Sequence, residues 1–215
     1  MTIALEPLLD QIPDDVVGLC RRLREAGKRG WVVGGCVRDL LRGAGAKDWD
    51  VATDARPKEV MRIFRRVVPT GIKHGTVTVL LGGVGYEGTT LRGEGSYSDG
   101  RRPDSVVFLD DLEEDLARRD FTFNAIAIDP LERSLIDPFG GQADLEERVV
   151  RAVGVAEERF SEDGLRILRA ARFAASLEAE VDPATLEAMG AERCRQTLAK
   201  VSVERVHDEW VKAMR

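Results

Sequence analysis

The fold is decided by residues 31–50, which read WVVGGCVRDLLRGAGAKDWD in the one-letter code. Residues 31–33 form an apolar run typical of a short strand, and Gly34 and Gly35 then predict a tight turn. Residues 36–42 predict a helix directly behind the turn. The first N–H groups of a helix have no partner within it and carry the positive end of its dipole, which favours an anion. The stretch therefore predicts a phosphate-binding turn.

Two aspartates end the stretch. Asp48 and Asp50 lie in the run 48–53, which we predict to be a strand. Positions two apart share one face of a strand, so both carboxylates project to the same side, with Cα atoms about 7 Å apart. Such a pair can hold Mg²⁺, and nucleotidyl transfer needs mainly positioning and charge neutralisation. This order predicts a two-metal nucleotidyltransferase, and the alternative is a solvated edge strand.

The composition limits the possible partners. The chain has 215 residues, 43% of them hydrophobic, and a net charge of −6. It can bury a core, but it has no global positive field for nucleic acid. Any contact with RNA or nucleotide must therefore use local arginines. We interpret Arg62, Arg65 and Arg66, in the helix expected from residue 57, as a solvated face.

The cysteines and the N-terminal region bear on the compartment. Cys20, Cys36 and Cys194 are few and widely spaced, which indicates a reduced compartment and argues against a zinc site. Residues 1–15 carry acidic residues and prolines rather than a basic start and an apolar core, and no run approaches the length of a membrane span. We therefore expect a cytoplasmic protein with no membrane partner.

The middle of the chain adds one candidate ligand. Residues 74–81 and 86–91 are β-rich and are joined by a glycine-rich turn, which predicts a hairpin. Glu87 could lie beside Asp48 and Asp50 on the next strand and provide a third acidic ligand. The alternative is an ordinary exposed strand residue.

Residues 93–105 are too glycine-rich and polar to form a regular element. A loop of this length in a compact domain is more often a lid or a binding loop than filler. Arg101 and Arg102 could meet phosphates when such a loop closes. The alternative is a disordered surface loop.

Arginine, aspartate and asparagine meet near residue 120. Arg118, Arg119 and Asp120 end a short acidic helix, and Asn124 follows in the next segment. Such groups can hold ribose hydroxyls and phosphate oxygens, because arginine forms charge-assisted hydrogen bonds. An ion-paired corner without a ligand is the alternative.

The C-terminal part is mostly helical from residue 142, and we predict a helical second unit that begins near residue 153. A polar stripe recurs there every three residues, at Asp163, Arg166, Arg169 and Arg172. A carboxylate beside a guanidinium offers an acceptor and a bidentate donor, as recognition of a base edge requires. The alternative is an i, i+3 salt bridge on a wet surface.

Seven motifs in a fixed order make the chain recognisable. They are Gly34-Gly35-x-x-Arg38-Asp39, Asp48-x-Asp50, TGIKHGTVTV at 70–79, Arg101-Arg102-Pro103, RRDFTFNA at 118–125, DPFGG at 137–141 and Glu162-Asp163-x-x-Arg166. The set resembles the class II tRNA nucleotidyltransferases, or CCA-adding enzymes, and the related bacterial poly(A) polymerases of the polymerase β superfamily. The resemblance covers roughly residues 25–215.

This resemblance implies an α+β fold. It consists of a polymerase β-like nucleotidyltransferase head with a small mixed sheet, in residues 1–152, and an all-helical neck, in residues 153–215. Family members continue through body and tail domains that grip tRNA, whereas this chain stops at Arg215. We therefore expect either a shortened protein or an RNA grip supplied elsewhere, and the net charge of −6 fits that expectation.

The resemblance also implies roles for individual residues in the head. Asp48 and Asp50 would carry the Mg²⁺ ions, with Glu87 as a tentative third ligand. The residues implied to bind the nucleotide through its triphosphate and ribose are Gly34, Gly35, Arg38, Asp39, Arg119, Asp120 and Asn124.

In the neck, the resemblance implies a protein template for the base. Asp163 and Arg166 would pair with the base of CTP or ATP, with Glu162 orienting Arg166. Arg169 and Arg172 would contact phosphate.

The implied reaction transfers C and A from CTP and ATP to the 3′ end of tRNA and releases pyrophosphate. Residues 70–76 look like the CCA-adding type, and the loop around 93–104 resembles the loop that helps the site switch from CTP to ATP. The loop argues against an enzyme that adds only CC. The alternatives are an A-adding or CC-adding enzyme, a poly(A) polymerase and, from another class, a non-catalytic RNA- or nucleotide-binding module.

Overall fold

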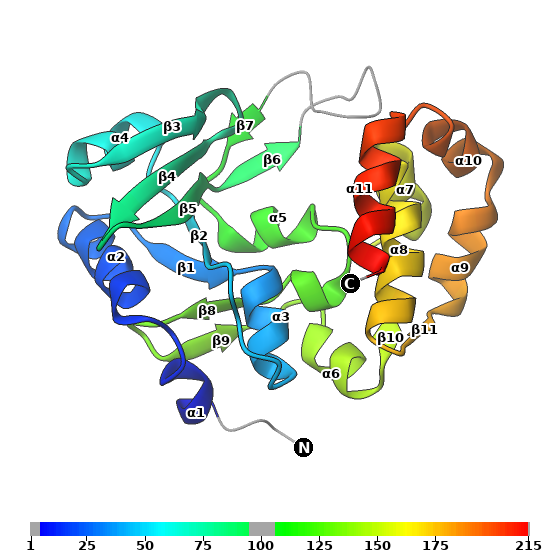
Figure 1. Cartoon of the computed structure of the whole chain (residues 1–215), viewed down its shortest axis with the longest axis horizontal. Coiled ribbons are helices and arrows are strands. Elements are labelled where there is room, and N and C mark those ends of the chain that lie inside the picture. Colours follow the sequence, from blue (N-terminus) through cyan, green and yellow to red (C-terminus); the bar gives the residue numbers. More distant parts are fainter. Residues whose placement is uncertain (1–4, 95–105, 215) are drawn as a thin grey trace. The chain divides into compact units, whose positions relative to one another are not determined.

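The computed structural model describes residues 5–94 and 106–214 (Figure 1). Its helices are α1 (Glu6–Leu9), α2 (Asp14–Glu25), α3 (Gly35–Leu41), α4 (Pro57–Ile63), α5 (Leu112–Ala117), α6 (Gly141–Glu146), α7 (Ala156–Glu162), α8 (Leu165–Ser176), α9 (Pro183–Gly190), α10 (Glu192–Leu198), α11 (Val203–Ala213) and the 3-10 helices η1 (Ile72–His74) and η2 (Thr122–Asn124). Its strands are β1 (Gly30–Val33), β2 (Asp50–Thr53), β3 (Val67–Gly71), β4 (Thr76–Leu81), β5 (Val84–Thr90), β6 (Arg92–Glu94), β7 (Val106–Phe108), β8 (Ala127–Asp129), β9 (Ser134–Ile136), β10 (Val149–Val150) and β11 (Glu180–Val181).

The described residues pack into two compact units. The first contains residues 5–93, 106–116 and 124–138, and the second contains residue 94 and residues 117–123 and 139–214. The domain boundary that we predict near residue 153 stays a prediction, although residues 139–152 pack with the second unit.

A seven-stranded sheet forms the first unit, in the order β3-β4-β5-β2-β1-β8-β9. Strands β2 and β5 run parallel, and every other neighbouring pair in this sheet is antiparallel. The central strand β1 is buried along its whole length, with α2 and α3 packed against it. The α+β class with a mixed sheet is therefore confirmed.

Strand β2 begins later than the sequence predicts. Val33, the last residue of β1, faces Asp50, the first residue of β2, and the chain then turns away at Gly34. Asp48 therefore has no strand residue on β1 to pair with and lies in the preceding loop. The prediction that residues 48–53 form one strand is wrong for Asp48 and Trp49.

The second unit is built on aromatic packing. Phe121 stacks on Phe123 with ring centroids 5.6 Å apart, and Phe173 meets both rings edge-on at 5.6 and 5.1 Å. These rings belong to a cluster of buried residues that also includes Phe160. Among its described residues from 139 onward, the unit contains helices and the two-residue strands β10 and β11, which pair in parallel. The predicted neck therefore contains one short strand, β11, in addition to its helices.

Some predictions concern residues that the structure does not describe. Arg101 and Arg102 of the predicted binding loop lie outside the described residues. Within the described ranges, no helix combines the length and apolar character needed to cross a bilayer.

Candidate functional site

The glycine turn after β1 has the conformation that the sequence predicts. Gly34 has φ 82° and ψ −136°, a combination that side chains on other residues disfavour strongly. This turn ends β1 and starts α3 at the next residue. Gly35 lies against the guanidinium of Arg38, since a Cβ there would be 3.5 Å from an Arg38 nitrogen. The turn and Arg38 are therefore neighbours in space.

Arg38 joins three of the predicted nucleotide-binding residues into one cluster. Its Nε and one terminal nitrogen donate to the two carboxylate oxygens of Asp39 at 2.9 and 3.1 Å, and its other terminal nitrogen donates to Asn124 Oδ1 at 3.0 Å. The Arg38 side chain is only 16% exposed. A guanidinium bonded through three nitrogens is held in one orientation, so its positive charge has a fixed place beside Gly35.

The three predicted carboxylates line one cavity. Asp50 on β2 faces Glu87 on the parallel strand β5, and Asp48 lies in the loop before β2. The cavity has a volume of about 600 Å³ and is lined by Pro13, Lys47, Asp48, Trp49, Asp50, Val84, Gly85, Tyr86 and Glu87. Strand register therefore places Glu87 beside Asp50, as the sequence predicts.

The donor set of this cavity fits a hard divalent cation. Carboxylate oxygens are the ligands that Mg²⁺ prefers, and three such groups share the cavity wall. Among the described residues, however, no three His, Cys, Asp or Glu side chains are gathered closely enough to hold a metal ion. The roles of Asp48, Asp50 and Glu87 as ligands therefore stay predictions.

Cys36 lies in the first turn of α3, next to this cavity. Its thiol donates to the Val33 carbonyl oxygen at 3.2 Å. Burial raises the pKa of Cys36 to about 11, and the nearby negative charge of Asp50 acts in the same direction. The thiol is therefore protonated at neutral pH and is a packing group rather than a nucleophile.

In the second unit, Asp120 and Arg169 form a direct ion pair. Arg169, on α8, donates from Nε to Asp120 Oδ2 at 2.7 Å, and the main-chain N–H of Phe121 donates to Asp120 Oδ1 at 2.8 Å. Arg119, the preceding residue, is half-buried. Burial opposes the charge on Arg169, but Asp120 and Glu209 outweigh this effect, so the pKa of Arg169 is raised. The predicted ribose-binding aspartate is thus already bound to a predicted phosphate-binding arginine.

Arg166 is the most enclosed member of the polar stripe, at 8% exposure. It donates to Glu162 Oε2 at 2.6 Å, and to the carbonyl oxygens of Arg159 and Arg118 at 3.0 Å each. Glu162 also pairs with Arg159 at 2.5 Å. The contact between Glu162 and Arg166 is the one that an orienting role for Glu162 requires.

The other members of the stripe are held by α11, which the sequence analysis did not connect with them. Arg205 donates to both carboxylate oxygens of Asp163, at 3.2 and 2.7 Å. Glu209, only 4% exposed, accepts from Arg172 Nε at 2.6 Å. Asp163 thus pairs with Arg205 rather than with Arg166. The alternative of a solvent-exposed i, i+3 salt bridge therefore does not describe this stripe.

Arg205 and Glu209 were detectable in principle. They lie four residues apart in an amphipathic helix, so they share one face, and their charges complement those of Asp163 and Arg172. Burial by itself would raise the pKa of Glu209, but hydrogen bonds from Arg172 and Lys212 and the charge of Arg169 outweigh it. The pKa of Glu209 is therefore lowered.

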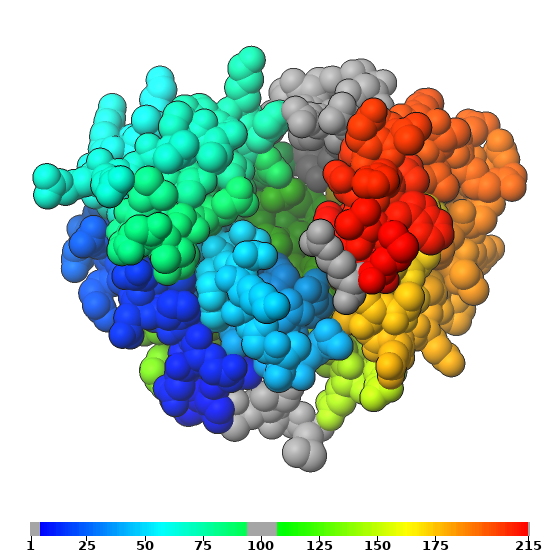
Figure 2. Space-filling model, in the orientation of Figure 1, coloured from blue at the N-terminus to red at the C-terminus, as the bar shows by residue number. Residues whose placement is uncertain are grey.

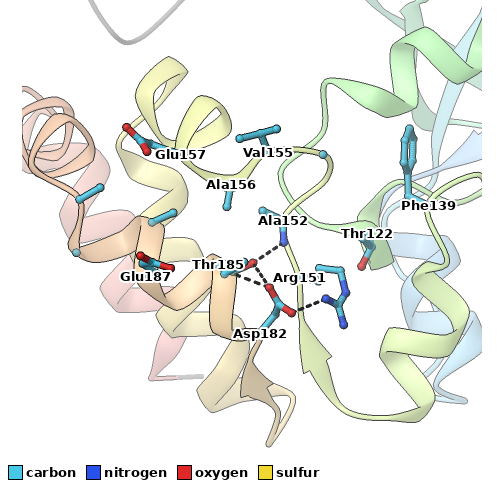
Figure 3. A pocket seen from close by; sticks show the side chains of 15 residues that line it. Thr122, Phe139, Arg151, Ala152, Val155, Ala156, Glu157, Asp182, Thr185 and Glu187 are labelled. Carbon is cyan, nitrogen blue, oxygen red and sulfur yellow. Dashed lines mark hydrogen bonds and ion pairs between the residues drawn. The ribbon is translucent and has the colours of Figure 1, made fainter.

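A larger cavity in the second unit contains none of the predicted site residues (Figure 3). Its volume is about 790 Å³, and the segment that follows β10, together with α7 and α9, contributes to its wall. Arg151 pairs there with Asp182, whose carboxylate also accepts from the N–H of Thr185 at 3.1 Å as the N-terminal cap of α9. The Thr185 hydroxyl accepts from the N–H of Ala152 at 3.1 Å. These polar groups bind one another and hold the helix in place.

Comparison with protein families gives a match over the centre of the chain. The family described as the Poly A polymerase head domain matches residues 30–151. Among individual proteins, the chain is 50% identical over 192 residues to the CCA-adding enzyme of Lactobacillus johnsonii, an alignment that covers 89% of this chain and 48% of that enzyme. The CCA-adding enzyme of Ligilactobacillus salivarius is 46% identical over 210 residues, which cover 96% of this chain and 51% of that enzyme.

Solved structures agree with this result. The Bacillus stearothermophilus CCA-adding enzyme in complex with CTP matches with a TM-score of 0.83 and 44% identity, over 92% of this chain and 47% of that one. The Thermotoga maritima CCA-adding enzyme complexed with tRNA matches with a TM-score of 0.78 and 27% identity, over 98% of this chain and 50% of that one. The chain spans about half the length of these relatives. It therefore belongs to the Poly A polymerase head domain family, with CCA-adding enzymes as its relatives.

Proposed function

We propose that the chain carries nucleotidyl transfer and nucleotide selection for an enzyme that adds C and A, from CTP and ATP, to the 3′ end of tRNA. The observation that carries this proposal is the pairing of Asp50 with Glu87 on parallel strands, at a cavity that Asp48 also lines. The relatives supply the substrates, because one solved relative was crystallised with CTP and another is complexed with tRNA.

Gly34, Gly35 and the Arg38 cluster are proposed to bind the triphosphate. Phosphate oxygens need donors and positive charge, and Arg38 offers both from a position fixed by Asp39 and Asn124. A charge that is already oriented needs little reorganisation as the leaving pyrophosphate gains negative charge. The proposed role of this cluster is therefore to stabilise that charge during attack of the tRNA 3′-hydroxyl on the α-phosphate.

Asp48 and Asp50, with Glu87 as a third ligand, are proposed to bind Mg²⁺. When bound there, the ions would lower the pKa of the attacking hydroxyl and neutralise the leaving group. The chain's own contribution is to keep two of the carboxylates on adjacent strands, where the main-chain register fixes their separation.

Asp163 and Arg166 are proposed to select the base. An acceptor and a bidentate donor can pair with the edges of cytosine or adenine. Arg205 holds Asp163, and Glu162 holds Arg166, so neither side chain has to be ordered when the base arrives. Arg119 and Asp120 are proposed to bind the ribose, and Arg169 and Arg172 the phosphates.

A cytoplasmic location is part of the same proposal. Its support is that Cys20, Cys36 and Cys194 are all unpaired thiols in the structure and all are buried.

The test is an incorporation assay with tRNA that lacks CCA and with tRNA that ends in CC. CTP alone should extend only the first, ATP alone only the second, and both together should complete CCA. Extension by ATP alone on any RNA would instead identify a poly(A) polymerase, and extension of only one tRNA would identify a partial enzyme. In the same assay, Arg166→Ala should weaken the choice between CTP and ATP more than it weakens triphosphate binding.

The proposal fails if the chain incorporates neither nucleotide. A non-catalytic binding module is then the alternative, and calorimetry with Mg²⁺ and CTP separates the outcomes. Binding without incorporation indicates such a module, whereas absence of binding removes the nucleotide site as well.

A further inference from the structure

Four exposed cations gather where α4 leads into β3. They are Lys58, Arg62, Arg65 and Arg66, which we call the basic corner. Residues 58–66 have a net charge of +3, in a chain whose net charge is −6. In Figure 2 this part of the first unit, in cyan, has side chains that project into the solvent. The corner is therefore a local positive field on an acidic protein.

Packing points these cations outward. Val60 and Phe64 are 2% and 3% exposed, and they bury the opposite side of α4. Lys58 and Arg62 are four residues apart and therefore share one helix face. An amphipathic helix with its apolar side in the core keeps its charged side in water.

The single acid of this segment does not neutralise the corner. Glu59 accepts from the main-chain N–H of Arg56 at 2.7 Å and pairs with Lys28 at 3.0 Å. Within the part of the chain that the structure describes, no carboxylate lies within ion-pair distance of the four cations. Arg56, by contrast, pairs with Asp110 and is not part of the corner. The four charges are available to a partner.

Strand register relates the corner to the carboxylate cavity. The N–H of Leu80 donates to the carbonyl oxygen of Arg66 at 2.9 Å, and Leu80 faces Gly85, which lines the cavity. Residues that face one another across strands share one face of the sheet, and Glu87 is two positions after Gly85. Arg66, one residue before β3, therefore lies at the end of the sheet where Gly85 lines the cavity.

The same register gives the separation. Strands β3, β4, β5 and β2 are consecutive neighbours in the sheet. Three strand spacings of about 4.8 Å, or about 14 Å in all, therefore separate the start of β3, next to Arg66, from β2, which carries Asp50. In the proposed function the triphosphate of the nucleotide is bound by the glycine turn and by Arg38, which Asp39 orients. The corner instead suits a longer polyanion whose end lies at the carboxylates.

We propose that the basic corner binds the sugar–phosphate backbone of the RNA substrate, a short distance upstream of the 3′ end. This inference rests on the proposed function, because it takes the reacting 3′ end to lie at Asp48 and Asp50. Arginine is well suited to phosphate, since its planar guanidinium donates two parallel hydrogen bonds. The contact is independent of base sequence, because phosphate contacts position the RNA and do not identify its bases.

The chain offers a matched control for this proposal. Arg65-Arg66 and Arg21-Arg22 are both adjacent pairs of exposed arginines in the first unit, but the second pair lies on α2, where Asp14, Asp15 and Glu25 balance the three arginines. The variants R65Q/R66Q and R21Q/R22Q therefore remove equal charge from different surroundings. Circular dichroism and thermal unfolding establish that each variant is folded.

Binding of tRNA lacking CCA is measured by fluorescence anisotropy between 50 mM and 300 mM salt, separately from incorporation. We expect R65Q/R66Q to weaken binding about tenfold near 0.15 M salt, and to reduce the slope of log affinity against log salt by about 1.4. R21Q/R22Q should change neither quantity more than about twofold, and the KM for CTP should be unchanged in both.

Equal losses in the two variants overturn the proposal, because any surface charge would then do the same. A raised KM for CTP with unchanged RNA affinity also overturns it and assigns the corner to the nucleotide. Absence of RNA binding by the unsubstituted chain overturns it as well. If the chain binds RNA through Arg65 and Arg66 but incorporates nothing, the corner is supported and only the proposed function fails.

Discussion

In the first unit the glycine turn and the two carboxylate strands are placed by the main chain, whereas in the second unit the candidate residues are held by the side chains of other residues. Gly34 turns the chain beside Arg38, and the pairing of β2 with β5 sets Asp50 beside Glu87. In the second unit the corresponding residues are held by ion pairs, such as that of Asp163 with Arg205.

This difference determines how strongly each site should respond to pH. Main-chain geometry is set by steric limits and hydrogen bonds that do not titrate, so pH should have little effect on where Gly34 and the strands of Asp50 and Glu87 lie. Ion pairs depend on the ionisation of both partners and on how far they are shielded from water. The polar stripe of the second unit should therefore be the part of the molecule that is more sensitive to acid.

The largest expected effect is on catalysis in the first unit. Asp50→Ala should lower incorporation at least a thousandfold, or about 4 kcal/mol of transition-state stabilisation, because a ligand oxygen is lost. This expectation rests on the proposed role of Asp50 as a Mg²⁺ ligand. The measurement is single-turnover incorporation of CTP, with circular dichroism to show that the fold is retained. Asp10→Ala removes an exposed carboxylate outside the site and serves as the control. Substantial activity in the Asp50 variant would remove the carboxylate pair from the mechanism.

A smaller effect should follow from changing the glycine turn. Gly34→Ala should lower the free energy of unfolding by about 2 to 3 kcal/mol, because φ 82° with ψ −136° is outside the regions open to alanine. Gly43 also has a positive φ, of 67°, and it has open space around its Cβ position. Gly43→Ala should therefore cost only about 1 kcal/mol. Urea unfolding measures both, and equal costs would refute the main-chain argument for Gly34.

The smallest effect concerns pH and the second unit. Arg172 and Lys212 lower the pKa of Glu209 in the folded state, despite the burial of this side chain. Glu209 therefore stabilises the fold fully above its ordinary pKa of 4.5. This stabilisation is lost as the pH falls through the lower pKa of the folded state. Glu209→Gln should cost about 1 to 2 kcal/mol at neutral pH, and the difference from the unsubstituted chain should shrink below about pH 4.5.

Unfolding by urea at several pH values gives this difference. Glu192→Gln is the control, since Glu192 pairs with Arg195 on the open surface. A pH-independent difference for Glu209→Gln would mean that packing, and not ion pairing, explains its contribution.

The features that follow from local pattern could be predicted from the sequence. The paired glycines indicated the turn, and the hairpin pattern placed Glu87 on the strand next to Asp50. Glu162 and Arg166, four residues apart, meet as helix geometry requires.

What could not be predicted depends on where elements end and which helices meet. Asp48 falls outside β2 although β5 extends level with it, because the chain of β1 turns away after Val33, so the start of a strand depends on its neighbours as well as on its own residues. The partners of Asp163 and Arg172 come from α11, about forty residues away, and tertiary packing alone selects that helix.

The parallel pairing of β2 and β5 also bears on where the chain could be opened. Between these strands the polypeptide makes an excursion through α4, β3 and β4, and it returns through an exposed turn at Gly82 and Gly83. Four residue pairs join β5 to β2, and they lie at the end of β5 that is farther along the chain from that turn. A circular permutant with new termini between the two glycines would therefore keep both carboxylate strands in register, so continuity of the chain at this hairpin is dispensable for the geometry of the cavity.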